Sequence, residues 1–307
     1  MEKIRKLPKE RRRIRGSTIF VILMLAYPVA HFLLMWIGVN INSIFLTFKN
    51  YNSSGNLDWL TWDHLFDNYK ILFLSFKDPN TQQMFLVSLG YFVVSCLITL
   101  PIALFFSYFM FKKIKGNGFF KIIFYLPSIL PLVILTLVFS LSLDPSIGIV
   151  SYISDLLNVK APAFFIGENA KYTVYFFCIW AGIGYDVILL SAGMSRIPRE
   201  ILESSKIDGT GTMREFFRII VPLTWPTITT LFVLGMMSVF NVYLQPFFLT
   251  AGQYGTTTIG LQIYWISQGN TNLQTGATLG LFCSLIGAPV ILGVRALMNR
   301  CYADVDF

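Results

Sequence analysis

One aspartate stands inside an apolar segment of this 307-residue chain. Asp186 is the only charged residue in the stretch 172–194. A carboxylate deep in a membrane costs about 2.5–3.5 kcal/mol on insertion scales, and such groups normally face a bundle interior or water. If this stretch is a helix, Gly182 lies four residues before Asp186 on the same face, with Tyr185 adjacent. The spacing predicts a small, polar stripe that lines a cavity.

A second polar stripe is expected in the stretch 228–249. Ser238, Asn241 and Gln245 recur there at helical spacing, with Tyr243 nearby. Two such stripes on consecutive helices indicate a passage for a hydroxyl-rich solute. The same groups could instead hydrogen-bond between helices, for about 0.6 kcal/mol each on average. Both interpretations stay open, and the candidate solute-pathway residues are Gly182, Tyr185, Asp186, Ser238, Asn241, Tyr243 and Gln245.

A charged interval, 195–226, separates these two apolar stretches. Pro198 suits the first turn of a short helix, for which Ser195 is a candidate cap. The pair Asp208-Gly209 is a turn dipeptide that would end this helix. A second helix is expected from about Thr212 to Pro222, with an apolar side formed by Met213, Phe216, Phe217 and Ile220.

A short helix with an apolar tip and flanking charges is suited to a groove on a partner protein. A helix of this composition could also lie on the lipid headgroups. The sequence pattern by itself leaves both possibilities open.

Other chemistry is not indicated. The chain contains no Gly-Lys dipeptide, so a phosphate-binding loop of the G-x-x-x-x-G-K-[ST] type is absent from the sequence. No two of the four cysteines have metal-ligand spacing, and neither His31 nor His64 suggests catalysis. We therefore expect no cofactor or metal bound by this chain and no enzyme activity of its own.

The elements that must position these residues are membrane helices. Apolar residues make up 55% of the chain and charged residues 13%, which excludes a water-soluble globule. A span needs roughly 20 apolar residues and must be helical, because lipid cannot satisfy open backbone groups. An all-α integral membrane protein is predicted, with six spans at 18–39, 85–110, 121–143, 172–194, 228–249 and 275–298.

The basic residues predict the orientation of these spans. Lysine and arginine gather in the segment 1–17, between the second and third spans, in the interval 195–226, and after the sixth span. The positive-inside rule then makes both termini and that interval cytoplasmic. The expected organisation is a basic tail 1–17, a permease domain 18–298 and a short tail 299–307. A nucleic-acid patch at 11–15 is disfavoured, and the lipid bilayer is the expected surroundings.

The charged interval resembles the signature loop of permease subunits of ATP-binding-cassette importers. The usual form is Glu-Ala-Ala, three residues, Gly, nine residues, then Ile-x-Leu-Pro. Glu203, Gly209 and Ile219-x-Val221-Pro222 keep this spacing, with Ser204 and Ser205 in place of both alanines. The resemblance implies a six-helix type I importer fold.

In that family the loop forms a coupling helix, which docks in a cleft of the cytoplasmic ATPase subunit. The resemblance implies that Glu203 meets a basic residue on the ATPase, that Gly209 permits a sharp turn, and that Asp208 orders it. ATP and Mg²⁺ would be bound by the ATPase. The implied ATPase-coupling residues are Glu203, Ser204, Ser205, Asp208 and Gly209.

Further segments resemble the maltose-type, binding-protein-dependent sugar permeases, and in particular their first-permease type. They are 45–52, 67–73, 124–131 and the end of the fifth span, so the resemblance covers the chain from about residue 18 onward. Gly182, Tyr185 and Ser238 match substrate-contacting positions of that family. The segment 251–255 departs, because Asn-Gly-Gly-Pro is usual there.

The resemblance predicts a subunit that forms half of the translocation pathway for a sugar or oligosaccharide. Its partners would be a second permease, two ATPase subunits and an extracytoplasmic solute-binding protein, in the cell membrane of a prokaryote. One alternative keeps this architecture and imports a polyamine, amino acid or phosphate. Another is a proton-coupled secondary transporter, which would need more intramembrane carboxylates than Asp186. A non-transporting scaffold conflicts with the polar stripes.

Overall fold

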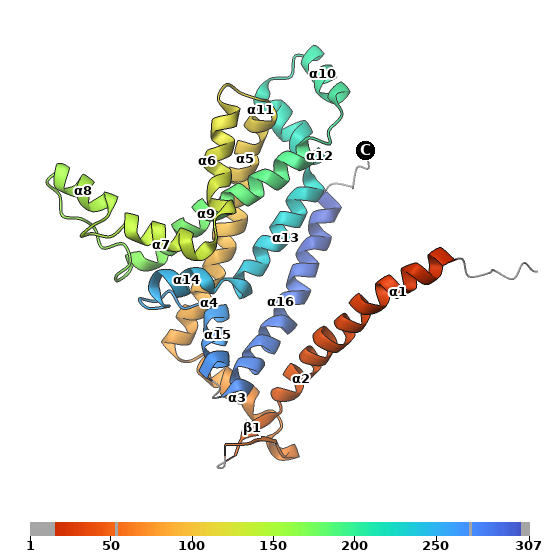
Figure 1. The fold of residues 1–307 in the computed structure, drawn as a ribbon, viewed down its shortest axis with the longest axis vertical. Coiled ribbons are helices and arrows are strands. Elements are labelled where there is room, and N and C mark those ends of the chain that lie inside the picture. The colour runs from red at the N-terminus through yellow and green to blue at the C-terminus, as the bar shows by residue number, and fades with distance from the viewer. Residues whose placement is uncertain (1–15, 53–54, 270–271, 302–307) are drawn as a thin grey trace, which may run out of the picture. The chain divides into compact units, whose positions relative to one another are not determined.

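The computed structural model describes residues 16–52, 55–269 and 272–301 (Figure 1). The predicted tails 1–17 and 299–307 fall largely outside these residues. The chain divides into two compact units, Met1–Leu65 and Phe66–Phe307.

The first unit is one long apolar helix followed by a hairpin. α1 (Gly16–His31) continues through a π-helical segment (Phe32–Ile37) into α2 (Gly38–Leu46). This helix contains the predicted span 18–39 and is long and apolar enough to cross a membrane. β1 (Lys49–Tyr51) and β2 (Leu57–Trp59) pair antiparallel, with Asn50 opposite Asp58, and a 3₁₀ turn (Trp62–His64) follows.

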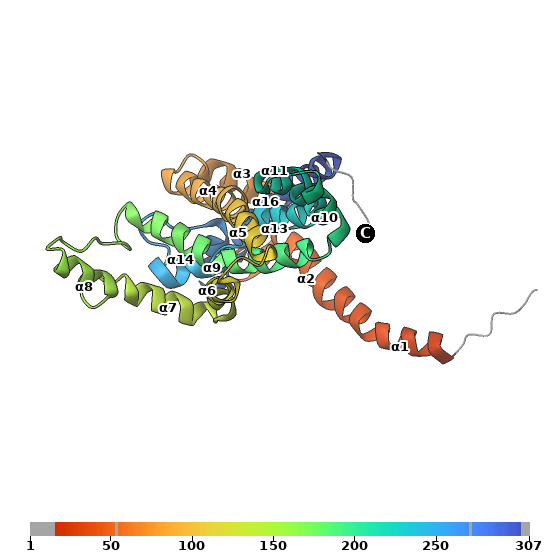
Figure 2. The same cartoon turned by 90° about the horizontal axis from the view of Figure 1, so that it is seen from above.

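The second unit is a bundle of helices (Figures 1 and 2). Its elements, in chain order, are α3 (Asp67–Ser75), α4 (Pro79–Phe92), a π-helical segment (Val93–Thr99), α5 (Leu100–Phe111), α6 (Asn117–Ile129), α7 (Leu132–Ser142), α8 (Ile149–Leu156), α9 (Asn169–Met194), α10 (Arg199–Ile207), α11 (Thr212–Glu215), a second π-helical segment (Phe216–Ile220), α12 (Val221–Leu223), α13 (Trp225–Asn241), α14 (Leu244–Thr250), α15 (Ile259–Gly269) and α16 (Leu273–Cys301).

Three predicted spans of this unit are single continuous helices. The spans 85–110, 172–194 and 275–298 lie within α4–α5, α9 and α16, each of which has the length and apolar composition of a membrane span. With the first unit, the described residues hold four such helices, and up to six when each bent pair counts as one span. Long apolar runs explain why these helices can span a membrane.

The third predicted span, 121–143, is wrong as a single helix. α6 and α7 meet at a bend of 109°. Leu130, at φ −76° and ψ 141°, is extended because it precedes Pro131, and a residue before proline is disfavoured in the helical region. In both views α7 and α8 project from the bundle (Figures 1 and 2).

The fifth predicted span, 228–249, is also interrupted. α13 ends at Asn241, Val242 is extended at φ −75° and ψ 111°, and α14 is a separate short helix. At its other end α13 meets the helical run Thr212–Leu223 at a bend of 73°. The indole N–H of Trp225 donates to the carbonyl of Met298 (2.8 Å), which ties the start of α13 to the end of α16.

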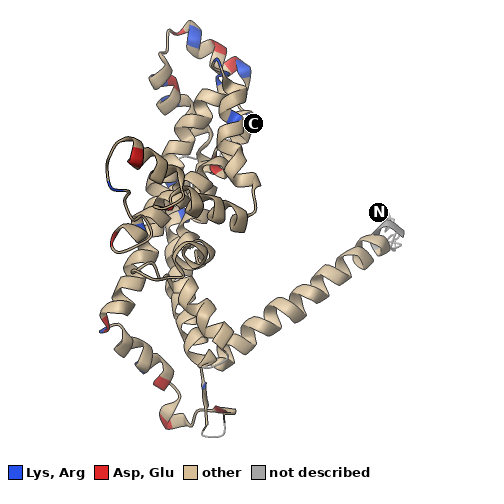
Figure 3. Ribbon diagram, turned by 60° about the vertical axis from the view of Figure 1, so that its left-hand side comes forward, with Lys and Arg blue, Asp and Glu red and all other residues tan. Residues whose placement is uncertain are grey.

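The core of the second unit lies where α5, α9 and α13 pack together. Ala103, Val187 and Leu190 are completely buried there, with Ile228 and Leu231 of α13 against them. α9 also packs along α6, so it is the central helix of the bundle. Positively and negatively charged residues follow one another along α10, at the top of the view, and others lie in the connections between helices (Figure 3).

Candidate functional site

The turn after α10 is closed by backbone hydrogen bonds. The amide of Gly209 donates to the carbonyl of Lys206, and the amide of Thr210 donates to that of Ser205, both at 3.0 Å. Gly209 has a φ of +66°, so this is a Schellman motif, in which the left-handed residue is usually glycine. The carboxylate of Asp208 takes part in no hydrogen bond in the described part of the chain, so the backbone orders this turn.

α10 stands at one end of the bundle with an exposed tip (Figure 1). Glu203 and Ser204 are exposed, whereas Ser205 is buried. Ile207, at the last position of the helix, is 87% exposed. Ser195 does not cap this helix as expected; its hydroxyl donates to the carbonyl of Ser191 at the end of α9 (2.7 Å), and α10 begins after Pro198. The result is a short helix with charged and apolar groups directed outward.

A buried ion pair anchors the chain after α10 to the bundle. Glu215 is only 2% exposed, and both of its carboxylate oxygens accept from Lys112 Nζ, at 2.7 and 2.8 Å. The hydroxyl of Tyr108 donates to the carbonyl of Thr212 (3.2 Å). The sequence interpretation missed this anchor, because Lys112 was counted only for topology and its partner lies 103 positions away.

The second helix of the interval splits its apolar residues between two directions. Phe216 and Ile220 are buried, and the ring of Phe216 lies 5.1 Å from that of Tyr108. Met213 and Phe217 are exposed. The expected single apolar side is therefore wrong. The π-helical segment Phe216–Ile220 is wider than an α-helical turn and changes the register of the residues that follow.

A cavity of about 420 Å³ lies in the middle of the bundle. Its walls come from α4 and the π-helical segment after it, the α6–α7 bend, α9, α13 and Gln245 of α14. Five of the seven predicted pathway residues line it: Gly182, Tyr185, Asp186, Ser238 and Gln245. The structure therefore brings the two predicted stripes together around one space.

The lining groups differ in what they offer to a solute. Asp186 lines the cavity without a hydrogen-bond or ion-pair partner among the described residues, and Tyr185 is exposed. The hydroxyl of Ser238 instead donates to the carbonyls of Gly235 (2.6 Å) and Tyr91 (3.2 Å). Its geometry fits the helix-bonding interpretation, whereas Asp186 and Tyr185 face the space.

Asn241 and Tyr243 do not line this cavity. The predicted polar stripe of the fifth span assumed one continuous helix. In the structure α13 ends at Asn241, which is exposed. Tyr243 lies in the break, and its ring packs against that of Tyr264 at 5.3 Å. Gln245 reaches the cavity from α14. The expectation of one helical face is wrong from Asn241 onward, because the backbone changes direction there.

Several lining residues were missed by the sequence interpretation. Tyr91, Ser95, Thr99 and Ser128 contribute polar groups from α4, the segment after it and α6. Ser95 and Thr99 are four residues apart in the second apolar stretch, which was a readable signal of a polar face. Ser128 is part of the wall because α6 packs along α9.

Comparisons with known proteins identify the family and the fold of this chain. The family model described as binding-protein-dependent transport system inner membrane component matches residues 99–302. The multiple sugar-binding transport system permease protein MsmF of Streptococcus mutans is 24% identical over 91% of this chain and 94% of its own length. The sn-glycerol-3-phosphate transport system permease protein UgpA of Agrobacterium fabrum is 25% identical over 70% of this chain and 73% of its own.

A solved structure has the same fold. One chain of a bacterial alginate ABC transporter, crystallised in complex with an alginate pentasaccharide-bound periplasmic protein, superposes with a TM-score of 0.80. The alignment covers 94% of this chain and 97% of that one, at 20% sequence identity. The predicted six-helix type I importer fold is confirmed by this likeness.

Proposed function

The chain belongs to the family of binding-protein-dependent transport system inner membrane components, and we propose that it is the permease subunit of an ATP-driven importer of a sugar or oligosaccharide. It is a multi-pass membrane protein and a transport subunit rather than an enzyme. The observation that carries the proposal is the exposed α10 with its left-handed turn at Gly209, held at one end of a bundle whose cavity is lined by Tyr185, Asp186 and Gln245.

α10 is the proposed coupling helix. It would dock in a groove of an ATPase subunit, with Glu203 meeting a basic residue there and Ile207 entering an apolar pocket. The basic residues near α10 support a cytoplasmic location for this end, in the cytoplasmic membrane of a prokaryote (Figure 3). ATP and Mg²⁺ would be bound by the two ATPase subunits, which do the chemical work.

During ATP hydrolysis the ATPase subunits would move α10. The ion pair of Lys112 and Glu215 would transmit this movement to the bundle. A displacement of α10 pulls on Thr212–Glu215, and the ion pair connects that segment to the end of α5. α5 packs along α9, whose Tyr185 and Asp186 line the cavity. An alternating-access cycle requires two arrangements of these helices, biased by nucleotide and by an external solute-binding protein.

The cavity supports a hydroxyl-rich solute. Its wall combines a carboxylate, hydroxyls and the amide of Gln245 with the exposed aromatic side chain of Tyr185. Sugars hydrogen-bond to the former and lie against the latter. The names of relatives, including MsmF, point to the same class of solute. A second permease would complete the other half of the passage.

A solute with a positive charge is the second candidate. Asp186 is the specific observation in its favour, because a carboxylate in a low-dielectric cavity attracts a cation strongly. A neutral sugar can also donate hydroxyl hydrogen bonds to it. Removal of the Asp186 charge should therefore affect the transport of a cationic solute more than the transport of a neutral sugar.

Reconstitution tests the proposal. The assembly captured through this chain would be placed in liposomes, and uptake of labelled oligosaccharides, polyamines, amino acids and phosphate would be compared with and without internal ATP. We expect uptake of a sugar or oligosaccharide only with ATP and the solute-binding protein present. Uptake driven by a proton gradient without ATP, or capture without an ATPase subunit, would contradict the importer. Selective uptake of polyamines would show that the transported solute is a polyamine and not a sugar.

A further inference from the structure

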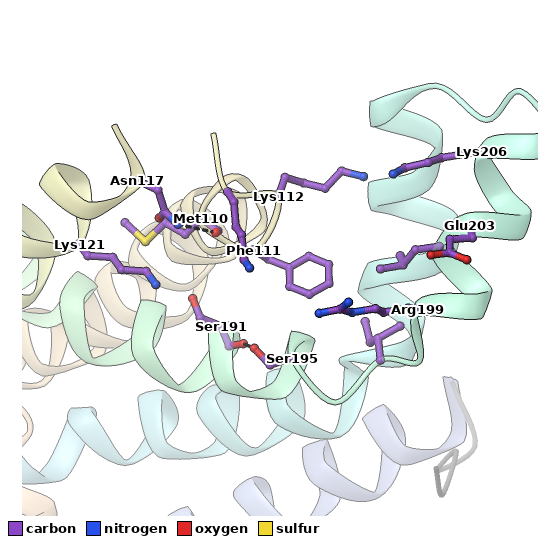
Figure 4. Close-up of a pocket in the computed structure, with 13 residues that line it drawn as sticks. Met110, Phe111, Lys112, Asn117, Lys121, Ser191, Ser195, Arg199, Glu203 and Lys206 are labelled. Atoms are coloured by element: carbon purple, nitrogen blue, oxygen red, sulfur yellow. Dashed lines mark hydrogen bonds between the residues drawn. The ribbon is translucent and has the colours of Figure 1, made fainter. Parts of the chain in front are cut away.

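A second cavity, of about 590 Å³, lies beside α10 and has a strongly basic lining (Figure 4). It is bounded by the end of α5, the start of α6, the end of α9, and α10. Its lining contains one acidic residue, Glu203, and five basic ones: Lys112, Lys113, Lys121, Arg199 and Lys206. The proposed transport cycle uses only Lys112 and Glu203 of these six.

Four of these cations have no counter-ion in the part of the chain that the structure describes. Lys112 is paired with Glu215. Among the described residues, no carboxylate lies within ion-pair distance of the other four cations, which are Lys113, Lys121, Arg199 and Lys206. Arg199 and Lys206 reach from α10 toward the end of α5, and Lys121 points from α6 toward Ser191 (Figure 4). Cations from three elements thus converge on one space, where Glu203 is the one acidic residue of the lining, and together they attract an anionic group.

Two uncharged groups in the same lining also lack partners. The hydroxyl of Ser191 and the side-chain carbonyl of Asn117 are buried without a hydrogen bond, although the Asn117 amide donates to the carbonyl of Met110 (3.2 Å). A buried polar atom without a partner is unfavourable. The Ser191 hydroxyl can donate to an anionic oxygen. The lining therefore offers positive charge from several directions together with a neutral donor.

The position of the cavity identifies the class of anion. α5 ends at Phe111, α6 begins at Asn117 and α9 ends at Met194, so the cavity lies beside the ends of three apolar helices. Phospholipid phosphates lie where apolar helices leave a membrane. Met110, Phe111 and Leu202 add apolar surface beside the cations, which suits a headgroup attached to acyl chains. A free nucleotide would not need this apolar surface.

We propose that this cavity binds the phosphate group of an anionic phospholipid, with Lys121, Arg199 and Ser191 as its main contacts. The bound headgroup bridges α10 to the α5–α6 end of the bundle. Occupancy therefore holds α10 in one orientation, and the lipid composition of the membrane affects how well α10 engages its partner. This lipid site goes beyond the transport function and does not depend on which solute is carried.

Native mass spectrometry of the purified assembly tests the site. Phosphatidylglycerol would be titrated onto the detergent-solubilised complex, with phosphatidylcholine and inorganic phosphate as separate probes. We expect Lys121→Gln with Arg199→Gln to weaken phosphatidylglycerol binding roughly tenfold or more, since each basic residue contributes about 1 kcal/mol near an anionic surface. Ser191→Ala is expected to weaken it a few-fold without any change of charge.

Two matched variants serve as controls. Lys160→Gln with Lys171→Gln also removes two charges, but Lys171 is near the start of α9, at the end opposite the cavity. This pair is expected to bind phosphatidylglycerol normally, and so is the charge-conserving pair Lys121→Arg with Arg199→Lys. An equal loss of phosphatidylglycerol binding in the Lys121/Arg199 and the Lys160/Lys171 double variants would overturn the site.

Two other results would overturn the lipid assignment. If inorganic phosphate binds with the same dependence on Lys121 and Arg199, the ligand is a soluble phosphate. If the neutralised pair instead loses its ATPase partner while phosphatidylglycerol binding is unchanged, the cations form a protein interface.

Discussion

The turn after α10 and the cavity beside α9 differ in the range of the contacts that form them. The turn is closed by hydrogen bonds between residues three and five positions apart, Gly209 to Lys206 and Thr210 to Ser205. The cavity is lined by residues from Tyr91 to Gln245, and one of its hydrogen bonds joins Ser238 to Tyr91 across 147 positions. A local element is sensitive to backbone changes at single residues, whereas the cavity depends on how whole helices pack.

The largest expected effect comes from Gly209→Pro. Proline cannot adopt a φ of +66° and has no amide hydrogen for the carbonyl of Lys206, so the turn cannot form. We expect ATPase co-purification to fall below detection while the chain still inserts in the membrane. Gly211→Pro is the matched control, because Gly211 already has a φ of −69°. Normal co-purification of Gly209→Pro would show that this turn is not the docking element.

The ion pair between Lys112 and Glu215 connects the segment that follows the α10 turn to the end of α5, which packs on the cavity-lining α9. The substitution Lys112→Gln tests this connection. Glu215 would remain buried without its counter-ion, which costs about 3–5 kcal/mol when a pair is fully buried and less here because Lys112 is partly exposed. We expect a clear fall in the melting temperature of the purified assembly. Lys70→Gln breaks the exposed pair with Asp67 and is expected to cost less than about 1 kcal/mol. Equal shifts in the two variants would contradict a buried anchor.

Substitutions at two glycines near the cavity distinguish an effect on helix packing from an effect on the passage of the solute. A methyl group at Gly235 would lie 2.7 Å from the sulfur of Cys96 and 2.8 Å from the hydroxyl of Ser95, so Gly235→Ala should cost about 1–3 kcal/mol of stability. At Gly182 the nearest atom would be Thr99 Cγ2 at 3.9 Å, so Gly182→Ala should fold normally and narrow the cavity. Thermal unfolding and uptake of the two variants should diverge. Unchanged uptake in Gly182→Ala would place the passage elsewhere.

The smallest expected effect is that of Asp186→Asn. The substitution keeps the shape of the side chain and removes its charge from the cavity. We expect about a tenfold change in apparent affinity, which corresponds to about 1.4 kcal/mol. A cationic solute should lose more affinity than a neutral sugar. Asn241→Ala is the control, because Asn241 does not line the cavity; the same transport by both variants would assign Asp186 to helix packing.

The sequence predicted the local elements well and the shared space only in part. The spans within α4–α5, α9 and α16 and the helix before Gly209 follow from composition and turn residues close together in the chain. The stripe on the fifth span was wrong from Asn241 onward, since no local signal marked the extended Val242. The bend after α6 could have been expected from Pro131, which disfavours helical backbone at Leu130.

By itself the sequence determined that this is a membrane protein and predicted the turn at Asp208-Gly209, because hydropathy, turn chemistry and the signature spacing are properties of neighbouring residues. Only the tertiary structure decided that Asp186 and Gln245 share a cavity, that Glu215 meets Lys112, and that four cations with no counter-ion among the described residues surround a second space. Those contacts join segments far apart in the chain. They depend on helix bends and on the faces that the packed helices turn toward one another, which a one-dimensional pattern does not contain.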